Sequence, residues 1–511
     1  MHLLHPARLL LCSLVISHSA FLTTPLSALP TAEQERLSRL SLADAAAEIR
    51  AGKATAIQLT EAVLARIDVY DTKLDAYITV MREQALAQAR VLDAEAAAGK
   101  FRGPLHGVPL ALKDNVDTAG VRTTGGSAAF ADRIPAEDAP VVTRMVAAGA
   151  IIIGKTDLQE FAMGGGESSY FGPSRNPWNL AHNTGGSSSG SGAAVSAFLA
   201  YGAIGTDTGG SIRMPASFSG IVGHKPTYGL VPIRGIIPLR ATMDHAGPMT
   251  RTVKDAALML NVLAGYDKFD ITSAEHAPKD DYVAALNQPV NRLRLGLPVG
   301  FNDHLDPEVE AAFKEALVVL NRLTAGSKEM SLPPSPRPIN GHAETLAWHE
   351  PHAALFSLYQ IPQRRRVEAW KKDGAGPAVD YVQDMWKVQL ARRTIDDVFA
   401  DAGVDLVVTT THRILPPKLD DLLARAYSTA ATDPHITSNC WAFNYFGLPS
   451  ISIPCGFSKD GLPIGLMISG PRFSDGKVLA LAHAYEQATQ WHKKQPPLTP
   501  ETPKPEINKP L

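Results

Sequence analysis

Cysteine, an excess of charge of one sign and long apolar runs are all scarce in this 511-residue chain. It has three cysteines, Cys12, Cys440 and Cys455, and no Cys/His spacing of the zinc-binding type. We therefore expect no metal and no cofactor. Cys440 and Cys455 could form a disulfide only after export, and the sequence leaves that pairing open.

The chain carries 49 basic and 51 acidic residues, a net charge of −2, and the two signs are interspersed. The absence of a basic stripe argues against a nucleic-acid partner, and the absence of an acidic run argues against a solvating tail. Beyond the N-terminus no segment reaches about 18 uninterrupted apolar residues, so we expect no membrane span in the mature chain. An apolar fraction of 45% over this length is enough for a large buried core.

The N-terminus has an apolar run from Leu9 to Ile16 after Arg8, followed by small residues that include Ser19 and Ala28. This run is too short to span a bilayer and is typical of a secretory signal peptide. We expect residues 1–28 to be a signal peptide and the chain to be periplasmic or secreted, with a cytoplasmic location as the alternative. At the other end, six of the last 16 residues are proline, which indicates an extended tail over 493–511.

Residues 33–492 show no internal repeat and no inert linker, which favours one large domain. Helical spacing covers 41–52, about 56–70 and about 81–98, and then strands and helices alternate. The stretches "GVPLALKDN" and "GAIIIGKTD" read as buried strands around a helical "DAPVVTRMVAAG", and strand patterns return at "VDLVVTTT" and "LPSISIPCGF". Residues 306–400 are mostly helical around "SLPPSPRPING". We predict an α/β fold whose central, mixed, largely parallel and twisted sheet is covered by helices on both faces.

Two short motif matches conflict with the residues around them. "GAIIIGKT" (149–156) fits the phosphate-binding loop pattern, but its three β-branched isoleucines are suited to a strand rather than a loop. "GSSSG" (186–190), centred on Ser188, fits the nucleophile elbow of α/β-hydrolases. That elbow needs a strand directly before it, and "NPWNLAHNTG" does not read as one.

Three other segments form a constellation. "LKDN" places Lys113 at the end of an apolar strand, "TGGSSSGSG" spans 184–192, and "GTDTGGSIRMP" follows, with Ser211 lying 24 positions after Ser187. Together they resemble the amidase signature family of Ser-Ser-Lys amide hydrolases. The resemblance continues through "EFAMG", "NPWN", "GIVGHKPTYG", "DHAGPMTRTVKDA", "FNYFGLPSISIPCGF" and "GLPIGLMISG". It covers roughly residues 40–490, except 306–400.

The resemblance implies that Ser211 is the nucleophile, Ser187 the bridging serine in a cis peptide with Gly186, and Lys113 the general base. A serine hydroxyl is a weak nucleophile until an adjacent base takes its proton. A lysine can act as that base only when it is neutral, and burial favours the neutral form. Asp114, next along the strand, should point to the opposite face.

The resemblance also implies a set of supporting residues around the nucleophile. Ser188 is expected to hydrogen-bond to Lys113, and Asp207 is expected to pair with Arg213 across the loop in a structural role. The backbone N–H groups of the oxyanion hole are expected from Thr208, Gly209, Gly210 and Ser211.

For the function, we expect a free-standing hydrolase that splits the C–N bond of a small-molecule amide through an acyl-enzyme. The product is a carboxylate plus ammonia or an amine, and the protein could form a homodimer. The alternative is the glutaminase (A) subunit of a tRNA-dependent amidotransferase, which releases ammonia for a partner subunit. Export argues against it, as does "GPAVDYVQDMWKVQLARR" where that subgroup has a tyrosine-rich stretch.

Two further alternatives have less support. Fatty-acid amide hydrolases share the core motifs, but the sequence shows no obvious membrane-inserting helix pair. A non-catalytic binding protein on the same scaffold would be expected to lose Lys113, Ser187 or Ser211, and all three are present. The acyl pocket is expected to lie partly in 306–400, so the substrate is not predicted.

Overall fold

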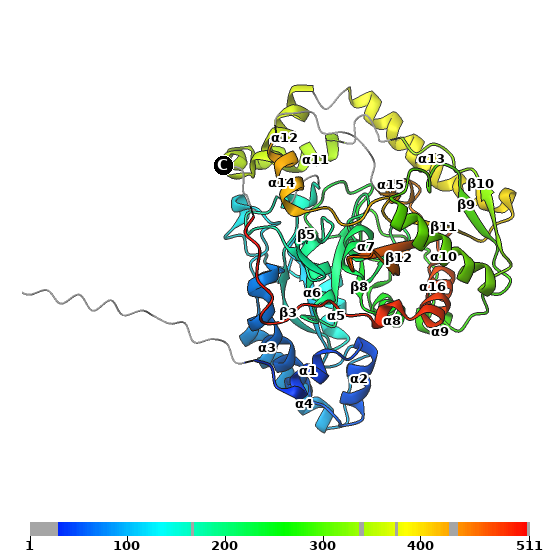
Figure 1. Cartoon of the computed structure of the whole chain (residues 1–511). Helices are drawn as coiled ribbons and strands as arrows, with labels where there is room; N and C mark the ends of the chain where they lie inside the picture. The colour runs from blue at the N-terminus through cyan, green and yellow to red at the C-terminus, as the bar shows by residue number, and fades with distance from the viewer. Residues whose placement is uncertain (1–28, 165–167, 337–341, 374–376, 429–437, 508–511) are drawn as a thin grey trace, which may run out of the picture.

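A computed structural model describes residues 29–164, 168–336, 342–373, 377–428 and 438–507. Within them one 11-stranded sheet runs through the molecule in the order β1-β3-β2-β6-β8-β7-β12-β13-β11-β9-β10 (Figure 1). Its strands are β1 (Tyr77–Val80), β2 (Pro109–Lys113), β3 (Ile151–Thr156), β6 (Gly202–Asp207), β7 (Val222–Lys225), β8 (His245–Thr250), β9 (Leu295–Pro298), β10 (Ser327–Met330), β11 (Leu406–Thr410), β12 (Ser450–Phe457) and β13 (Pro463–Ser469).

The predicted α/β class and mixed sheet are confirmed. Strand β2 lies parallel to β3 and β6, and at the far edge β9 lies parallel to β10 and β11. The pairings from β6 across to β11 are antiparallel, as is β1 with β3. Because β2 and β6 run the same way, their carboxyl ends meet at one edge of the sheet, where ligand sites of such sheets usually form.

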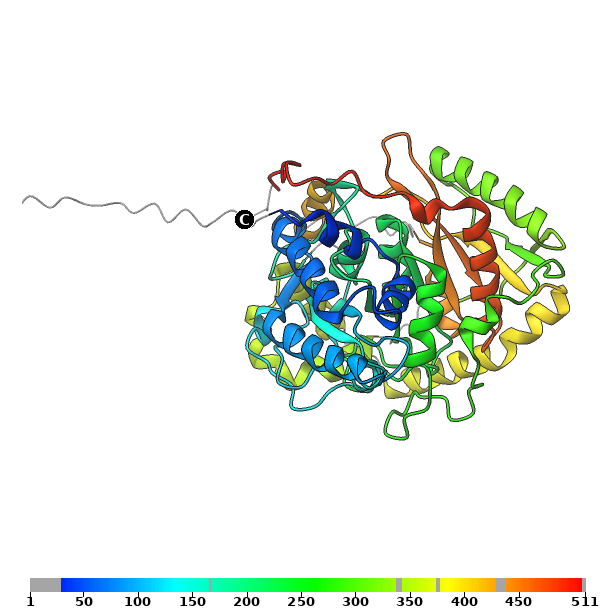
Figure 2. The same ribbon diagram turned by 90° about the horizontal axis from the view of Figure 1, so that it is seen from below.

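Helices cover both faces of the sheet (Figure 2). Helices α6 (Ser189–Ser196) and α7 (Arg213–Ser219) pack on one face, and α8 (Val253–Leu263), α10 (Pro307–Leu323) and α16 (Asp475–Thr489) pack on the other. Glycines allow the close approach: a Cβ on Gly465 would lie 2.4 Å from Ser217 Oγ of α7, and one on Gly456 would lie 2.9 Å from Ala312 of α10.

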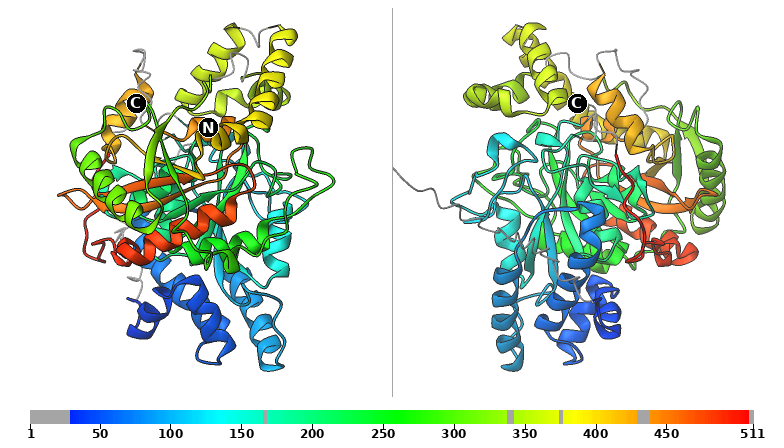
Figure 3. Two further views of the ribbon diagram at one scale, coloured as in Figure 1. Left: turned by 90° about the vertical axis from the view of Figure 1, so that its right-hand side faces the viewer. Right: turned by 60° about the vertical axis from the view of Figure 1, so that its left-hand side comes forward.

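Two further helical groups lie at opposite ends of the sheet (Figure 3). One comprises α1 (Ala32–Ser38), α2 (Leu42–Arg50), α3 (Ala56–Leu74) and α4 (Arg82–Ala97). The other comprises α11 (His342–His349), η3 (Glu350–Leu358), α12 (Ile361–Asp373) and α13 (Ala378–Ala402). The remaining elements are η1 (Ala128–Phe130), α5 (Pro140–Ala147), η2 (Glu160–Ala162), α9 (Tyr282–Ala285), α14 (Leu419–Tyr427), α15 (Trp441–Tyr445) and η4 (Trp491–Lys493).

The structure confirms most of the helices and strands predicted from the sequence. Helix α2 begins after Ser41, whose hydroxyl accepts a hydrogen bond from the Asp44 N–H, as its N-cap position predicts. Helix α3 continues past the expected end at Tyr70 to Leu74. The stretch "GAIIIGKT" forms the buried strand β3 and not a phosphate loop.

One local prediction is wrong. The stretch "NPWNLAHNTG" contains strand β5 (Asn179–Asn183), which pairs with β4 (Arg175–Asn176) in a separate two-stranded sheet. The Asn176 side chain accepts from the Trp178 N–H at 3.0 Å and donates to the Asn183 carbonyl at 2.8 Å, so polar side chains hold the hairpin. Because the hairpin lies outside the main sheet, Ser188 still does not follow a strand of that sheet.

Four other expectations concern the two chain ends, a membrane span and the cysteines. Residues 1–28, the predicted signal peptide, lie outside the described residues. The described part of the tail forms no helix or strand beyond η4. In the described segments, no helix is both long and apolar enough to cross a membrane. Cys440 and Cys455 are buried free thiols.

Candidate active site

Lys113 is the last residue of β2 and its side chain is fully buried. Its Nζ lies 2.8 Å from Ser187 Oγ and 2.8 Å from Thr206 Oγ1, the latter on the neighbouring parallel strand β6. Burial lowers the pKa of Lys113 to about 7, although the carboxylates of Asp207 and Asp244 act in the opposite direction. The side chain is therefore close to half neutral at neutral pH.

Ser187 follows Gly186 through a cis peptide bond. The Gln159 N–H donates to the Ser187 carbonyl at 3.2 Å. The Gln159 side chain fills the space beside Gly186, where a Cβ would lie 2.3 Å from Nε2. The serine loop is thus held from the segment after β3, and a side chain at 186 would displace the Gln159 amide.

Ser188 does not have its expected partner. Its hydroxyl donates to the Thr206 carbonyl at 3.2 Å and lies 3.3 Å from the Thr206 N–H, so it bonds to the backbone of β6. Among the contacts of the described residues, Thr206 and Ser187 hold the Lys113 amine. The prediction that Ser188 contacts Lys113 is wrong, because Ser188 is the N-cap residue of α6 and its side chain turns to the strand edge.

Ser211 lies between β6 and α7 and is 8% exposed. The Ser188 N–H donates to the Ser211 carbonyl at 3.3 Å, which joins the two serine loops. The structure therefore brings Lys113, Ser187 and Ser211 from three separate segments to the carboxyl edge of β2 and β6.

The glycine loop before Ser211 is held from within. The Gly210 N–H donates to Asp207 Oδ1 at 2.6 Å, and the Ile212 N–H donates to Asp207 Oδ2 at 3.2 Å. Gly210 has φ +131°, and a Cβ there would lie 2.8 Å from the Cys440 Cβ. The Gly210 N–H is thus bonded to Asp207, while Thr208, Gly209 and Ser211 remain the candidate oxyanion donors.

Asp207 and Arg213 form a fully buried ion pair, with Nε 3.0 Å from Oδ2. Asn444 Nδ2 also donates to Asp207 Oδ1, at 2.8 Å. Burial alone would raise the pKa of Asp207, but the Arg213 guanidinium holds it below its usual range. The carboxylate is therefore charged and anchors the loop that carries Ser211.

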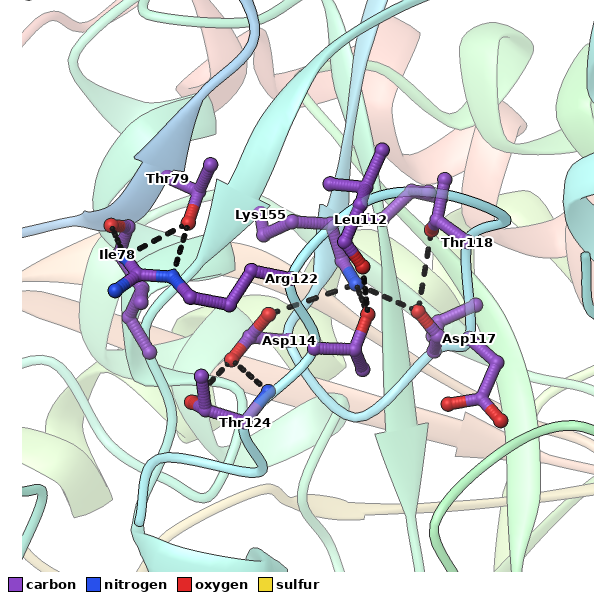
Figure 4. Close-up of polar contacts among 12 residues, drawn as sticks. Ile78, Thr79, Leu112, Asp114, Asp117, Thr118, Arg122, Thr124 and Lys155 are labelled. Atoms are coloured by element: carbon purple, nitrogen blue, oxygen red, sulfur yellow. Dashed lines mark hydrogen bonds and ion pairs between the residues drawn. The ribbon is translucent and has the colours of Figure 1, made fainter. Parts of the chain in front are cut away.

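The Asp114 side chain points toward Lys155 (Figure 4), and alternation along the strand places it on the face opposite to Lys113. Its Oδ2 accepts from the Thr124 N–H at 2.8 Å, and its Oδ1 lies 3.5 Å from the buried Nζ of Lys155 on β3. Lys155 also donates to the Val116 carbonyl at 2.7 Å and to Thr123 Oγ1 at 2.6 Å. Lys155, the lysine of the "GAIIIGKT" match, therefore fixes the segment that carries Lys113.

Sequence reasoning missed Thr206 and Asn115. Asn115 Nδ2 donates to Thr206 Oγ1 at 3.2 Å, so that hydroxyl contacts both Asn115 and the Lys113 amine. The signal that could have found them is the pairing of β2 with β6, in which Leu112 lies beside Ile204. Strand order was not predicted from the sequence, and without it Thr206 is one of two threonines in "GTDTGG".

Comparisons with known proteins give the chain's relatives. The family model described as Amidase matches residues 58–479. The A subunit of glutamyl-tRNA(Gln) amidotransferase from Moorella thermoacetica is 40% identical over 473 residues, which cover 86% of this chain and 95% of that protein. The solved A subunit of the same type of amidotransferase from Thermotoga maritima is 30% identical with a TM-score of 0.71, covering 90% of this chain and 96% of that one. Native peptide amidase from Stenotrophomonas maltophilia is 31% identical with a TM-score of 0.74, covering 90% and 98%.

The expectation of a free-standing hydrolase of small amides is wrong. The similarity to the A subunit of an amidotransferase, at 40% identity over most of both chains, overturns it and favours the alternative. The divergent stretch "GPAVDYVQDMWKVQLARR" does not exclude that alternative. Most of it forms helix α13, which buries only a few side chains, such as Val388 and Arg392, so the rest of its surface can vary without changing the fold.

Proposed function

The chain belongs to the amidase family and is an enzyme that acts on amide C–N bonds, and from this premise we propose that it is the glutamine-hydrolysing component of an amidotransferase. The observation that carries the proposal is the buried Lys113–Ser187 contact beside Ser211, in a chain 40% identical to an amidotransferase A subunit. The proposed reaction converts glutamine to glutamate and passes the released ammonia to a partner subunit.

The proposed first step is acylation. Neutral Lys113 accepts the proton of Ser187, and Ser187 accepts the proton of Ser211 as the Ser211 oxygen attacks the side-chain amide carbon of glutamine. The C–N bond then breaks, and the proton returns from Lys113 through Ser187 to the leaving nitrogen, which departs as ammonia.

The second step is deacylation. A water molecule loses a proton through Ser187 to Lys113 and attacks the ester carbon, and the bond to Ser211 Oγ breaks with return of that proton. The negative charge that develops on the carbonyl oxygen in both steps is assigned to the N–H groups of Thr208, Gly209 and Ser211. Each such donor contributes about 2.7–4 kcal/mol to transition-state stabilisation in enzymes that use one.

The partner and the location follow from the same proposal. An enzyme that supplies ammonia for a tRNA-linked reaction must meet its partner inside the cell, which conflicts with export after residue 28. N-terminal sequencing of the native protein tests this point. We expect an intact N-terminus, and a chain that begins after Ser19 or Ala28 would contradict the tRNA-linked role.

The central test uses the purified chain and a covalent probe, because such an enzyme can be slow without its partner. A fluorophosphonate should modify Ser211, located by peptide mass spectrometry, and glutamine should protect against the modification while glutamate amides of larger amines should not. Ser211→Ala should abolish labelling and glutamate release. Labelling at Ser188, or no protection by glutamine at any concentration, would reject the proposal.

A further inference from the structure

The first turn of helix α11 makes hydrogen bonds to loop 239–244, which precedes strand β8. The Glu344 carboxylate accepts from the Thr242 N–H at 3.0 Å and from the Thr242 hydroxyl at 2.6 Å. The Thr345 hydroxyl donates to the Leu239 carbonyl at 2.7 Å. The first turn of α11 therefore holds this loop both at its start and near its end.

Asp244, the last residue of the loop, joins it to the segment that carries the nucleophile. One oxygen of its carboxylate accepts from the Thr208 hydroxyl. The other oxygen accepts from the N–H groups of Leu239 and Arg240, at 2.9 Å and 3.0 Å. Hydrogen bonds to a charged acceptor are shorter and stronger than those between neutral groups. Thr208, a candidate oxyanion donor, is therefore attached to a loop that α11 holds.

The Asp244 carboxylate also acts on the proposed base. Asp207 and Asp244 are the two carboxylates that raise the pKa of Lys113 against the larger effect of burial. Burial raises the pKa of Asp244 to about 6, and its hydrogen bonds with Thr208 and the loop N–H groups act in the opposite direction. At neutral pH Asp244 is therefore mostly charged. The position of the loop affects both a candidate oxyanion donor and the base.

The other contacts of the loop act on its carbonyl groups. Arg392 Nη2 donates to the Thr242 carbonyl at 2.6 Å, and the Tyr228 hydroxyl donates to the Ala241 carbonyl at 3.0 Å. Glu344 instead accepts from two donors of one residue, the N–H and the hydroxyl of Thr242. An acidic residue in the first turn of a helix also stabilises that helix through its dipole. That effect alone requires no contact with the loop, so the test has to separate the two roles.

We infer that Glu344 is a positioning residue of the active site, which acts through Asp244 on Thr208 and Lys113. The inference rests on the proposed function for the roles of Thr208 and Lys113. Helix α11 belongs to the stretch 306–400, which lies outside the family resemblance of the sequence. A helix from this stretch thus supports the catalytic centre without supplying a reacting group.

The first test replaces the carboxylate. Glu344→Ala should lower kcat for glutamate release about tenfold with KM little changed, because a charged acceptor of two hydrogen bonds is lost. The inflection of kcat/KM should move to lower pH, because a displaced Asp244 raises the pKa of Lys113 less. Modification of Ser211 by a fluorophosphonate should slow by a similar factor, and this readout needs no glutamine.

The matched control is Glu350→Ala. Glu350 is an exposed carboxylate that pairs with Lys371 at 2.8 Å, in the same helical group and away from the loop. It should leave kcat, the labelling rate and the pH inflection unchanged. A Glu344→Ala protein with a lower Tm but an unchanged labelling rate and inflection would overturn the inference, since only the helix would then depend on Glu344.

A double variant tests whether Glu344 acts through Asp244. If it does, Glu344→Ala/Asp244→Asn should label at Ser211 no more slowly than Asp244→Asn alone. Losses that multiply would show that Glu344 acts independently of Asp244 and would overturn the inference.

Thr242→Val covers the case in which Glu344→Ala does not fold. It removes the hydroxyl bond to Glu344 and keeps the N–H bond, so the labelling rate should fall about threefold. An unchanged rate would overturn the inference. Slower labelling in these variants without glutamine protection of Ser211 would reject the proposed substrate and leave the role of Glu344 standing. Glutamine protection with unchanged labelling in the variants would reject the role of Glu344 alone.

Discussion

Two buried lysines lie on neighbouring strands of this molecule, Lys113 on β2 and Lys155 on β3, and their surroundings differ. Both are fully buried, and burial lowers the pKa of both. Lys155 has a carboxylate partner, Asp114, and a backbone carbonyl, whereas the closest partners of Lys113 are the hydroxyls of Ser187 and Thr206. A carboxylate favours the charged amine, whereas a hydroxyl can donate a hydrogen bond to a neutral amine or accept one from it.

The comparison shows that burial alone does not mark a catalytic lysine. Both lysines follow apolar strand residues, and both precede an aspartate within two positions, at Asp114 and Asp157. The distinction is made by neighbours across the sheet. Lys155 is a structural cation that fixes the β2 edge, and Lys113 is the group that the proposed mechanism uses as a base.

The largest expected effect separates the two lysines by activity. Lys113→Met should lower kcat at least about a thousandfold, because no other base contacts Ser187 in the proposed mechanism. The fold should persist, since an apolar side chain replaces a desolvated amine. The measurement is glutamate release together with the thermal midpoint, Tm. A Lys113→Arg enzyme with the original rate would remove Lys113 from the mechanism, because a guanidinium does not deprotonate in this range.

The reciprocal experiment separates them by stability. Lys155→Met leaves the Asp114 carboxylate buried without its cation, which should cost about 3–5 kcal/mol. Calorimetry should show a lower Tm, and the double variant Lys155→Met/Asp114→Asn should recover part of the loss. If Lys155→Met melts at the original temperature, the pair does not anchor the β2 edge.

The pH profile sharpens the contrast further. The active form of Lys113 is the neutral amine, so kcat/KM should rise with pH through an inflection near the pKa of about 7 and then level off. The Asp244 carboxylate raises that pKa, so Asp244→Asn should move the inflection to lower pH. Stopped assays over a range of about pH 5–10 in one constant-ionic-strength buffer measure both curves. An inflection that is unchanged in Asp244→Asn contradicts the electrostatic account.

The smallest effect concerns how Lys113 is held. Thr206→Val removes one hydrogen bond to the amine and should lower kcat about tenfold with KM little changed. Thr206→Ser, which restores the hydroxyl, should recover most of the rate. A purely structural role for Thr206 predicts the opposite pattern, a fall in Tm with kcat intact.

The site predictions came from different kinds of information. Lys113, Ser187 and Ser211 carry short motifs at fixed spacing, and the structure brings their segments together, although their catalytic roles stay proposals. Ser188 was assigned to the wrong partner, and the Gly210 N–H turns to Asp207, because both depend on side-chain directions in loops that spacing does not specify.

For the fold too, features set by local sequence were predicted and features set by side-chain or long-range contacts were not. The strands around Lys113 and Lys155 were predicted because apolar β-branched runs leave little choice of structure. Hairpin β4–β5 was missed because its stability comes from the Asn176 side chain and not from an apolar pattern. Strand order depends on contacts between residues far apart in the chain, and a single sequence does not display them.

In the run Lys113-Asp114-Asn115, three consecutive side chains make three different sets of contacts. Lys113 contacts Ser187, Asp114 points to Lys155, and Asn115 donates a hydrogen bond to Thr206. Inserting or deleting one residue here would shift the register of the strand, so that all three side chains would lose their contacts together. The helices at either end of the sheet supply none of these three side chains, so a change there leaves the register of this run intact.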